Sequence, residues 1–212
     1  MSLVVHSANP FASHRTRPGA IQFQFPDGAS VESLLARLRD NDYRGQIVGP
    51  HGSGKSTLLA TFLPVLEAHG VDVRSIALHD GQRRLPTDFL RTASGQSPLM
   101  LVVDGYEQLS YYSRAKLRWR CWQQGLGVLV TTHAKVAGLP VLISLVPTPT
   151  LMKELLDQLL AGDDSSDLQQ QAGISFHCHG GNLREVWFDL YDRYERRERE
   201  NPTCRVLPSA GK

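Results

Sequence analysis

The sequence predicts an α/β fold: a three-layer sandwich with a parallel five-stranded sheet, followed by a small C-terminal helical lid. Three observations predict it. Short apolar runs alternate with helical patterns up to about residue 147, as in a doubly wound sheet. From Thr148 onward the pattern is helical only. A glycine-rich loop stands between the first strand and its helix, at residues 49–54. We therefore expect an α/β domain at 1–147, a lid at 148–200 and a flexible tail at 201–212.

The first domain begins with an extension, residues 1–29, rich in proline and glycine, in which alternation over 21–25 predicts one edge strand. Ser30 is a typical N-cap for a helix with Leu34, Leu35 and Leu38 at helical spacing. Further helices are predicted from Lys55 to the stop at Gly70, around 88–92 and over 113–124. The predicted strands are 46–48, 71–78, 99–104, 127–132 and 141–145.

In the lid, leucines at helical spacing predict a helix that ends at Gly162, followed by an acidic loop over 163–167. A long helix opens at residues 180–182. Its end, residues 193–200, alternates charge signs, which favours a solvated helix over a nucleic-acid surface. His177 and His179 suggest a metal site, but structural zinc needs four ligands, so a short strand before the helix is the preferred interpretation.

The glycine-rich loop predicts an anion site. Its residues are Gly49, Pro50, His51, Gly52, Ser53, Gly54, Lys55, Ser56 and Thr57. Glycines let backbone N–H groups curl around an anion, and the helix N-terminus points its positive dipole end at the same place. Lys55 adds a charge for the β- and γ-phosphates, and the Ser56 hydroxyl can bind Mg²⁺. A chance glycine-rich turn is the alternative. We expect a nucleoside triphosphate, ATP (or ADP), with Mg²⁺.

A carboxylate follows the third predicted strand. Asp104 stands where an acid that holds the Mg²⁺ shell is expected, and an ordinary strand-end turn is the alternative. The next residue is Gly105, so the candidates for orienting a water are Glu107 and Gln108. Glu107 could instead satisfy backbone N–H groups at a helix start.

Thr131, Thr132 and His133 end the fourth predicted strand, which should lie beside the strand that precedes the loop. A hydroxyl or imidazole there can contact a γ-phosphate or the attacking water, and Thr132 and His133 are nearest the strand tip. The alternative is a cluster that caps a turn.

Together these motifs resemble the AAA+ class of P-loop NTPases, including its STAND-type relatives with NACHT-like modules. Residues 49–56 resemble Walker A, and Leu101 to Asp104 resemble Walker B. Residues 104–109 are similar to the STAND form of Walker B, except that Gln108 replaces its second acid. Thr131-Thr132 resembles sensor 1, and residues 181–185 resemble sensor 2. Asn9-Pro10-Phe11 is similar to an N-terminal segment that lies near the adenine in some AAA+ proteins.

The resemblance implies ATP bound with Mg²⁺ between sandwich and lid, with Thr132 and Arg184 sensing the γ-phosphate. Arg184 pairing with a carboxylate is the alternative. The activity implied is that of a slow ATPase, working as a nucleotide-dependent switch or in a homo-oligomer, with a protein partner still to be identified. An arginine finger would come from Arg118 or Arg120. The competing hypotheses are a module that binds nucleotide without hydrolysing it and a small-molecule kinase.

Composition adds few constraints. The 212 residues carry a net charge of +2, which does not indicate a nucleic-acid binder. Three scattered cysteines do not suggest disulfides, and no apolar run is long enough to span a membrane. We expect a cytoplasmic protein without a membrane partner.

Overall fold

Five parallel strands lie at the centre of the chain in a computed structural model that describes residues 9–90, 99–160 and 166–200. They are β1 (Arg44–Val48), β2 (Asp72–Ala77), β3 (Leu99–Asp104), β4 (Gly127–Thr132) and β5 (Val141–Ser144). Within the described residues they form a sheet in the order β2-β3-β4-β1-β5, and every neighbouring pair is parallel. The predicted α/β class and five-stranded parallel sheet are confirmed.

The strand register determines which residues lie together at the carboxyl ends of the strands, where the candidate site is. All six residues of β4 are buried, and so are the first five of β3, as expected for strands covered on both faces. Val48 pairs with Thr132, and Ala77 pairs with Asp104. The carboxyl ends of β1 and β4 therefore lie level, with Asp104 at the end of β3 on the other side of β4.

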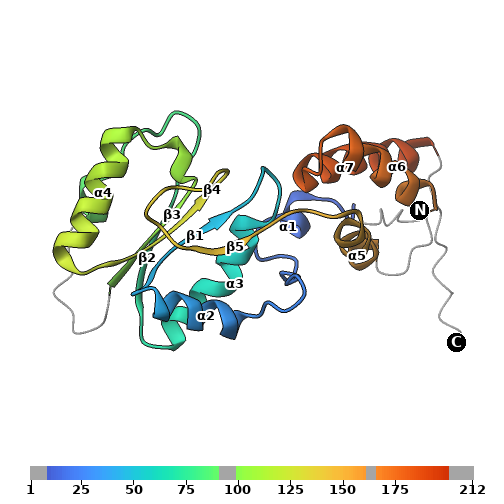
Figure 1. The fold of residues 1–212 in the computed structure, drawn as a ribbon. Helices are drawn as coiled ribbons and strands as arrows, with labels where there is room; N and C mark the ends of the chain where they lie inside the picture. The colour runs from blue at the N-terminus through green and yellow to red at the C-terminus, as the bar shows by residue number, and fades with distance from the viewer. Residues whose placement is uncertain (1–8, 91–98, 161–165, 201–212) are drawn as a thin grey trace, which may run out of the picture.

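Helices cover both faces of the sheet (Figure 1). On one face, α2 (Val31–Asp40) and α3 (Lys55–Ala68) bury side chains such as Leu38 and Phe62 against Ile47 and Leu129. On the other face, α4 (Tyr111–Gln124) packs Leu117 against the sheet. Two short 3₁₀ helices, η1 (Thr87–Leu90) and η2 (Tyr106–Gln108), complete this face. The helix expected over 88–92 is η1, and residues 91–92 lie outside the described part.

From residue 9 to residue 29 the N-terminal extension is irregular, apart from the single turn α1 (Ser13–Thr16). The edge strand predicted over residues 21–25 is wrong, because these residues adopt no strand. Phe23 and Phe25 instead meet edge to face, with ring centroids 4.8 Å apart, and pack against the core under α2 and α3. The Ser30 N-cap is confirmed: its side chain and that of Ser33 form a reciprocal capping box.

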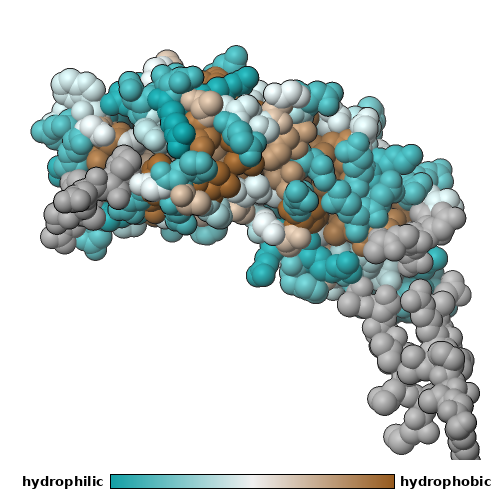
Figure 2. Space-filling view, turned by 90° about the horizontal axis from the view of Figure 1, so that it is seen from below, coloured by the Kyte–Doolittle hydropathy of each residue, from teal (hydrophilic) through white to brown (hydrophobic). Residues whose placement is uncertain are grey.

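Three helices, α5 (Pro149–Leu160), α6 (Ser166–Cys178) and α7 (Leu183–Glu200), form a bundle with a core of its own, which is named the lid after the prediction from the sequence. They extend to one side of the sheet (Figure 1), and the space-filling view from below shows an elongated molecule (Figure 2). Phe11 from the N-terminal segment belongs to this lid core, stacked on Trp187 at 6.2 Å.

Helix α6 corrects two expectations. Asp167 is helical rather than part of an acidic loop, whose residues 163–165 lie outside the described part. His177 ends a helix rather than lying on a strand. Leu168, Ala172 and Ser175, at helical spacing, bury this helix against its neighbours. The tail expected at 201–212 also lies outside the described residues.

Candidate functional site

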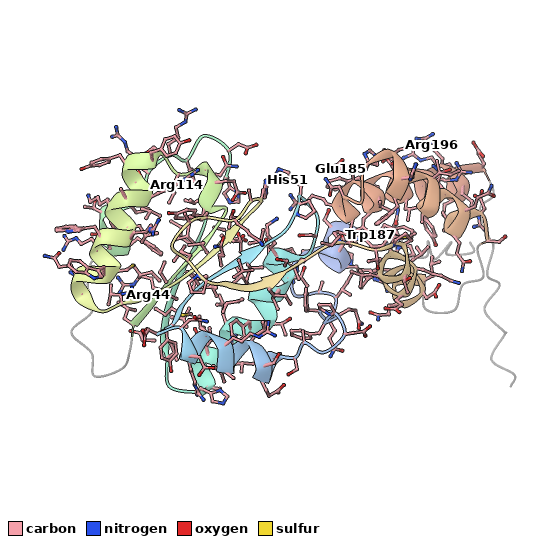
Figure 3. The ribbon with its side chains drawn as sticks, viewed as in Figure 1. Arg44, His51, Arg114, Glu185, Trp187 and Arg196 are labelled. Carbon is pink, nitrogen blue, oxygen red and sulfur yellow. The ribbon has the colours of Figure 1, made fainter. Side chains whose placement is uncertain are left out.

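The candidate site lies where the sequence places its chemistry, at the carboxyl ends of β1, β3 and β4. The backbone N–H of Gly49 donates to the carbonyl of Thr132 at 3.1 Å, so the glycine-rich loop leaves the sheet beside the tip of β4. His51 lies at this edge, toward the lid, whereas Arg44 lies at the opposite end of β1 (Figure 3). Loop, strand ends and lid therefore meet in one region.

The shape of the loop depends on its glycines. Gly52 and Gly54 have φ values of +67° and +87°, in the left-handed region that favours glycine. At Gly49 a Cβ atom would come within 2.8 Å of the Leu145 carbonyl oxygen and 2.5 Å of Ser53 Oγ. Ser53 Oγ is itself buried and has no hydrogen-bond partner among the residues that the structure describes. The loop is thus tightly closed around backbone groups, and one buried hydroxyl in it is unsatisfied.

Lys55 begins α3 and turns its ammonium group back into the loop. Its Nζ donates to the carbonyls of Gly49 and Pro50, both at 2.7 Å. Burial lowers the pKa of Lys55, and the negative charges of Glu107 and Asp104 only partly oppose that shift. Within the described residues Lys55 forms no ion pair with a carboxylate. The buried ammonium group of Lys55 is therefore hydrogen-bonded only to two neutral carbonyl groups in the described part of the chain.

Ser56, Asp104 and Thr131 form a hydroxyl–carboxylate–hydroxyl row beside the loop. Ser56 Oγ donates to Asp104 Oδ2 at 2.7 Å, across 48 residues of sequence. Thr131 Oγ1 donates to the other carboxylate oxygen and accepts from the Gly105 N–H at 2.9 Å. Gly105, with φ of +83°, makes the turn that leaves Asp104 in this position. The structure therefore brings together the two predicted Mg²⁺ ligands, Ser56 and Asp104.

Glu107 lies on η2 and faces the tip of β4. Its Oε1 is 2.8 Å from His133 Nε2, while Oε2 is buried and has no hydrogen-bond partner in the described part of the chain. The second candidate, Gln108, turns away and donates to Asp80 at 3.3 Å. The carboxylate of Glu107 binds an imidazole rather than helix-start N–H groups, and η2 has no side-chain cap. The two candidates therefore point to different partners, and Glu107, the one favoured from the sequence, is the one that faces β4.

Two histidines form an aromatic pair beside Glu107. The rings of His51, from the loop, and His133 meet edge to face with centroids 3.7 Å apart. Burial lowers the pKa of His133; Glu107 opposes this shift, while Lys55 and His51 add to it. Sequence reasoning had no signal for this pair, because residues 51 and 133 are brought together only by the pairing of β1 with β4.

The remaining predicted residues are placed differently. Thr132 Oγ1 accepts from the Ala134 N–H at 3.1 Å and also bonds the Ala134 carbonyl, so it caps the turn after β4. Thr131, which ranked below it, is the threonine that contacts Asp104. Thr57 lies in the first turn of α3. Arg184 is exposed on the first turn of α7, where its backbone N–H donates to Asn182 Oδ1 at 3.2 Å.

The lid touches the loop directly. Asn182, which precedes α7, places Oδ1 against the position where a Cβ on Gly52 would be, and the backbone nitrogen of Leu183 lies 2.9 Å from that position. The first turn of α7, including Arg184, therefore begins at the glycine-rich loop.

The donor set determines which groups the site can hold. The loop N–H groups and Lys55 suit an anion, and Ser56 with Asp104 offers two oxygen donors of the kind Mg²⁺ prefers. In the described residues there is no group of three or more His, Cys, Asp or Glu that could hold a metal by itself. His179 instead contacts Asp189 at 2.9 Å, and Ser175 donates to the same carboxylate oxygen. This cluster links α6 to α7.

The comparisons with known proteins assign no family. No protein-family model matches the chain, and no curated protein matches its sequence. None of the helices in the described ranges combines the length and the apolar character that crossing a bilayer requires.

Proposed function

We propose that this chain binds ATP with Mg²⁺ in the loop of residues 49–57 and hydrolyses it slowly, as a nucleotide-dependent switch. The observation that carries the proposal is the buried ammonium of Lys55, which is held by two backbone carbonyls and, within the described ranges, by no carboxylate. A buried charge without an opposite charge is costly, so the arrangement favours an anionic ligand. Loop N–H groups, the N-terminus of α3 and Lys55 would together receive a polyphosphate.

The residues present fit Mg²⁺ as well. Ser56 Oγ and Asp104 Oδ2 are already in contact, and Thr131 fixes the other oxygen of the carboxylate. Ser56 and Asp104 would hold the ion, which would neutralise phosphate charge when bound. The unsatisfied hydroxyl of Ser53 in the same loop is a further donor without a partner. These features support the P-loop resemblance of the sequence.

Hydrolysis requires a base near the phosphates, and Glu107 is the group we propose. His133 holds Oε1, which leaves the buried Oε2 as the free oxygen that could accept a proton from water. Lys55 would exchange the carbonyls of Gly49 and Pro50 for phosphate oxygens. The contact of Asn182 with Gly52 would report that change to α7 and the lid, with Arg184 nearby.

A module that binds nucleotide without hydrolysing it is the second candidate. The contact between Glu107 and His133 favours this candidate, because it already occupies one oxygen of the proposed base. The neutral Gln108 favours it too, because its side chain bonds Asp80 instead of facing the tip of β4. Both candidates share the same binding site, so only turnover distinguishes them.

Calorimetry with ATP and GTP, with and without Mg²⁺, tests binding. We expect Mg²⁺-linked affinity for ATP, lost on Lys55→Ala and retained on Lys116→Ala, which removes an exposed lysine on α4. Release of phosphate over many turnovers would support the switch, and its absence despite tight binding would support the non-hydrolysing module. An absence of nucleotide binding by the folded protein would reject both.

A further inference from the structure

Helix α4 presents aromatic side chains to solvent on the side opposite its core. Tyr111, Tyr112, Trp119 and Trp122 are 87%, 76%, 53% and 70% exposed, whereas Leu117 and Cys121 are buried. At 100° per residue, Tyr111, Trp119 and Trp122 lie across the helix from Leu117. A helix at the surface of a monomer normally carries charges there, so this outward face indicates an interaction surface.

The same helix is strongly basic. It carries Arg114, Lys116, Arg118 and Arg120 and has no acidic residue. The guanidinium groups of Arg118 and Arg44 form no hydrogen bond or ion pair with the described residues, whereas the Arg114 guanidinium donates to the Glu107 carbonyl at 2.6 Å and lies over the ring of Tyr111. Two guanidinium groups beside the tryptophans are therefore available to a carboxylate.

A groove joins these features at the C-terminal end of α4. Its volume is about 320 Å³, and its walls are Arg44, Arg118, Trp119, Trp122, Val128 and Leu139. The Arg118 guanidinium lies where a Cβ atom on residue 138 would be, so this position requires Gly138, whose φ is +76°. The groove is thus apolar at its floor and cationic at its rim. It lies at the amino end of β1, remote from the glycine-rich loop at the other end of that strand (Figure 3).

We propose that the outward face of α4 and this groove, together the α4 surface, dock an acidic segment of a protein partner. The tryptophans and tyrosines would cover apolar side chains of the segment, one of which enters the groove, while Arg118 and Arg44 pair with its carboxylates. Trp, Tyr and Arg are the residues that most often dominate protein interfaces. The apolar floor favours a protein segment over a single-stranded nucleic acid, which would need a continuous cationic track.

The charge balance specifies the partner further. Helix α4 carries four basic residues and no acidic one, so it complements a segment in which acidic and large apolar side chains alternate. A basic segment would be repelled. The surface includes none of the residues proposed to bind nucleotide in this chain. Arg118, a candidate arginine finger, would act on a neighbouring copy, so binding of a peptide by the single chain does not depend on the proposed function.

Intrinsic fluorescence tests the surface, because only Trp187 lies outside it among the three tryptophans of the chain. Trp187 is buried in the lid and can be removed as Trp187→Phe. The probe is a short peptide that alternates Glu with Leu and Phe, and its matched control replaces every Glu by Lys. We expect saturable binding of the acidic peptide, with a blue shift as Trp119 and Trp122 leave water.

Variants assign the contact. Arg118→Glu should weaken binding about tenfold or more, since it places like charges together, whereas Lys153→Glu, on an exposed lysine of α5, should not. The same titrations are repeated by calorimetry on the chain that keeps Trp187, which controls for an effect of Trp187→Phe on folding. Equal binding of the Lys peptide, indifference to Arg118→Glu, or no binding at all would overturn the proposal. So would preferential binding of an oligothymidine, or self-association that Trp119→Ala abolishes while the peptide fails to bind.

Discussion

The amide oxygen of Asn182 lies against Gly52, in the space that any side chain at position 52 would need. These two residues join the glycine-rich loop to the first turn of α7. The positive φ of Gly52 and the close approach of Asn182 both require glycine. The lid is therefore in contact with the part of the loop that an anion would reshape.

Gly52→Ala should destabilise the protein more than a strained backbone alone would. A left-handed alanine costs about 1–2 kcal/mol, and the contact with Asn182 adds a steric cost. Gly70→Ala is the matched control, because Gly70 has φ of +77° with no atom near a built Cβ. Denaturant unfolding should show the larger loss for Gly52→Ala; equal losses would mean that the loop and lid separate easily.

Asp104→Asn should reduce Mg²⁺-linked nucleotide affinity. The amide oxygen can accept from only one of the two hydroxyls, Ser56 or Thr131, and its NH2 group can only donate to the other. The substitution also removes the charge that would attract the ion. A charge-assisted contact is worth about 1.5–3 kcal/mol, so we expect a loss of about tenfold or more. Calorimetry with and without Mg²⁺ measures it. Asp80→Asn, at an exposed site, should leave binding unchanged.

Glu107→Gln should retain nucleotide binding and lower turnover by about 10² or more, the usual effect of losing a general base. His133→Gln keeps a donor for Glu107 and should have a smaller effect. Phosphate release measures both. Gln108→Ala is the control, because its side chain points to Asp80. An unchanged rate in Glu107→Gln would exclude this carboxylate as the base.

Stability should decrease as the pH falls below 6.5, the ordinary pKa of histidine, in part because of His133. Burial lowers the pKa of His133 in the folded chain, so the unfolded chain takes up the proton first. The free energy of unfolding then declines until the pH reaches the folded-state pKa. His133→Gln should flatten this part of the urea-unfolding profile, and His79→Gln, at an exposed position, should not. Parallel profiles for all three proteins would contradict the assignment.

Phe11→Ala should loosen the N-terminal segment from the lid. Phe11 is 2% exposed and stacks on Trp187, and Asn9 donates to the Tyr191 carbonyl and to Glu195. Removing a buried phenylalanine costs about 3–5 kcal/mol. Phe188→Ala, on the exposed side of α7, should cost less than about 0.5 kcal/mol. Trp187 emission during denaturant unfolding, with Trp119 and Trp122 replaced by Phe, reports both; similar values would show that Phe11 contributes little.

The elements with strong local patterns were predictable. Strands β3 and β4 are continuous apolar runs because both of their faces are buried. The start of α2 was predictable because an N-cap is a contact between neighbours in sequence. Helix α6 was missed because its buried side is small and sparse and Gly173 interrupts it; packing between α5 and α7 supports what local propensity does not. Residues 21–25 alternate like a strand but pack their phenylalanines onto the core without a pairing partner.

The sequence by itself determined the α/β class, the strand that ends in Asp104 and the position of the glycine-rich loop between β1 and α3, because each depends on residues close together in the chain. Only the tertiary structure decided that Thr131 rather than Thr132 holds Asp104, that Glu107 meets His133, and that Asn182 closes on Gly52. These contacts join residues that are distant in sequence. They depend on strand order, on register and on how the lid packs, none of which leaves a local pattern.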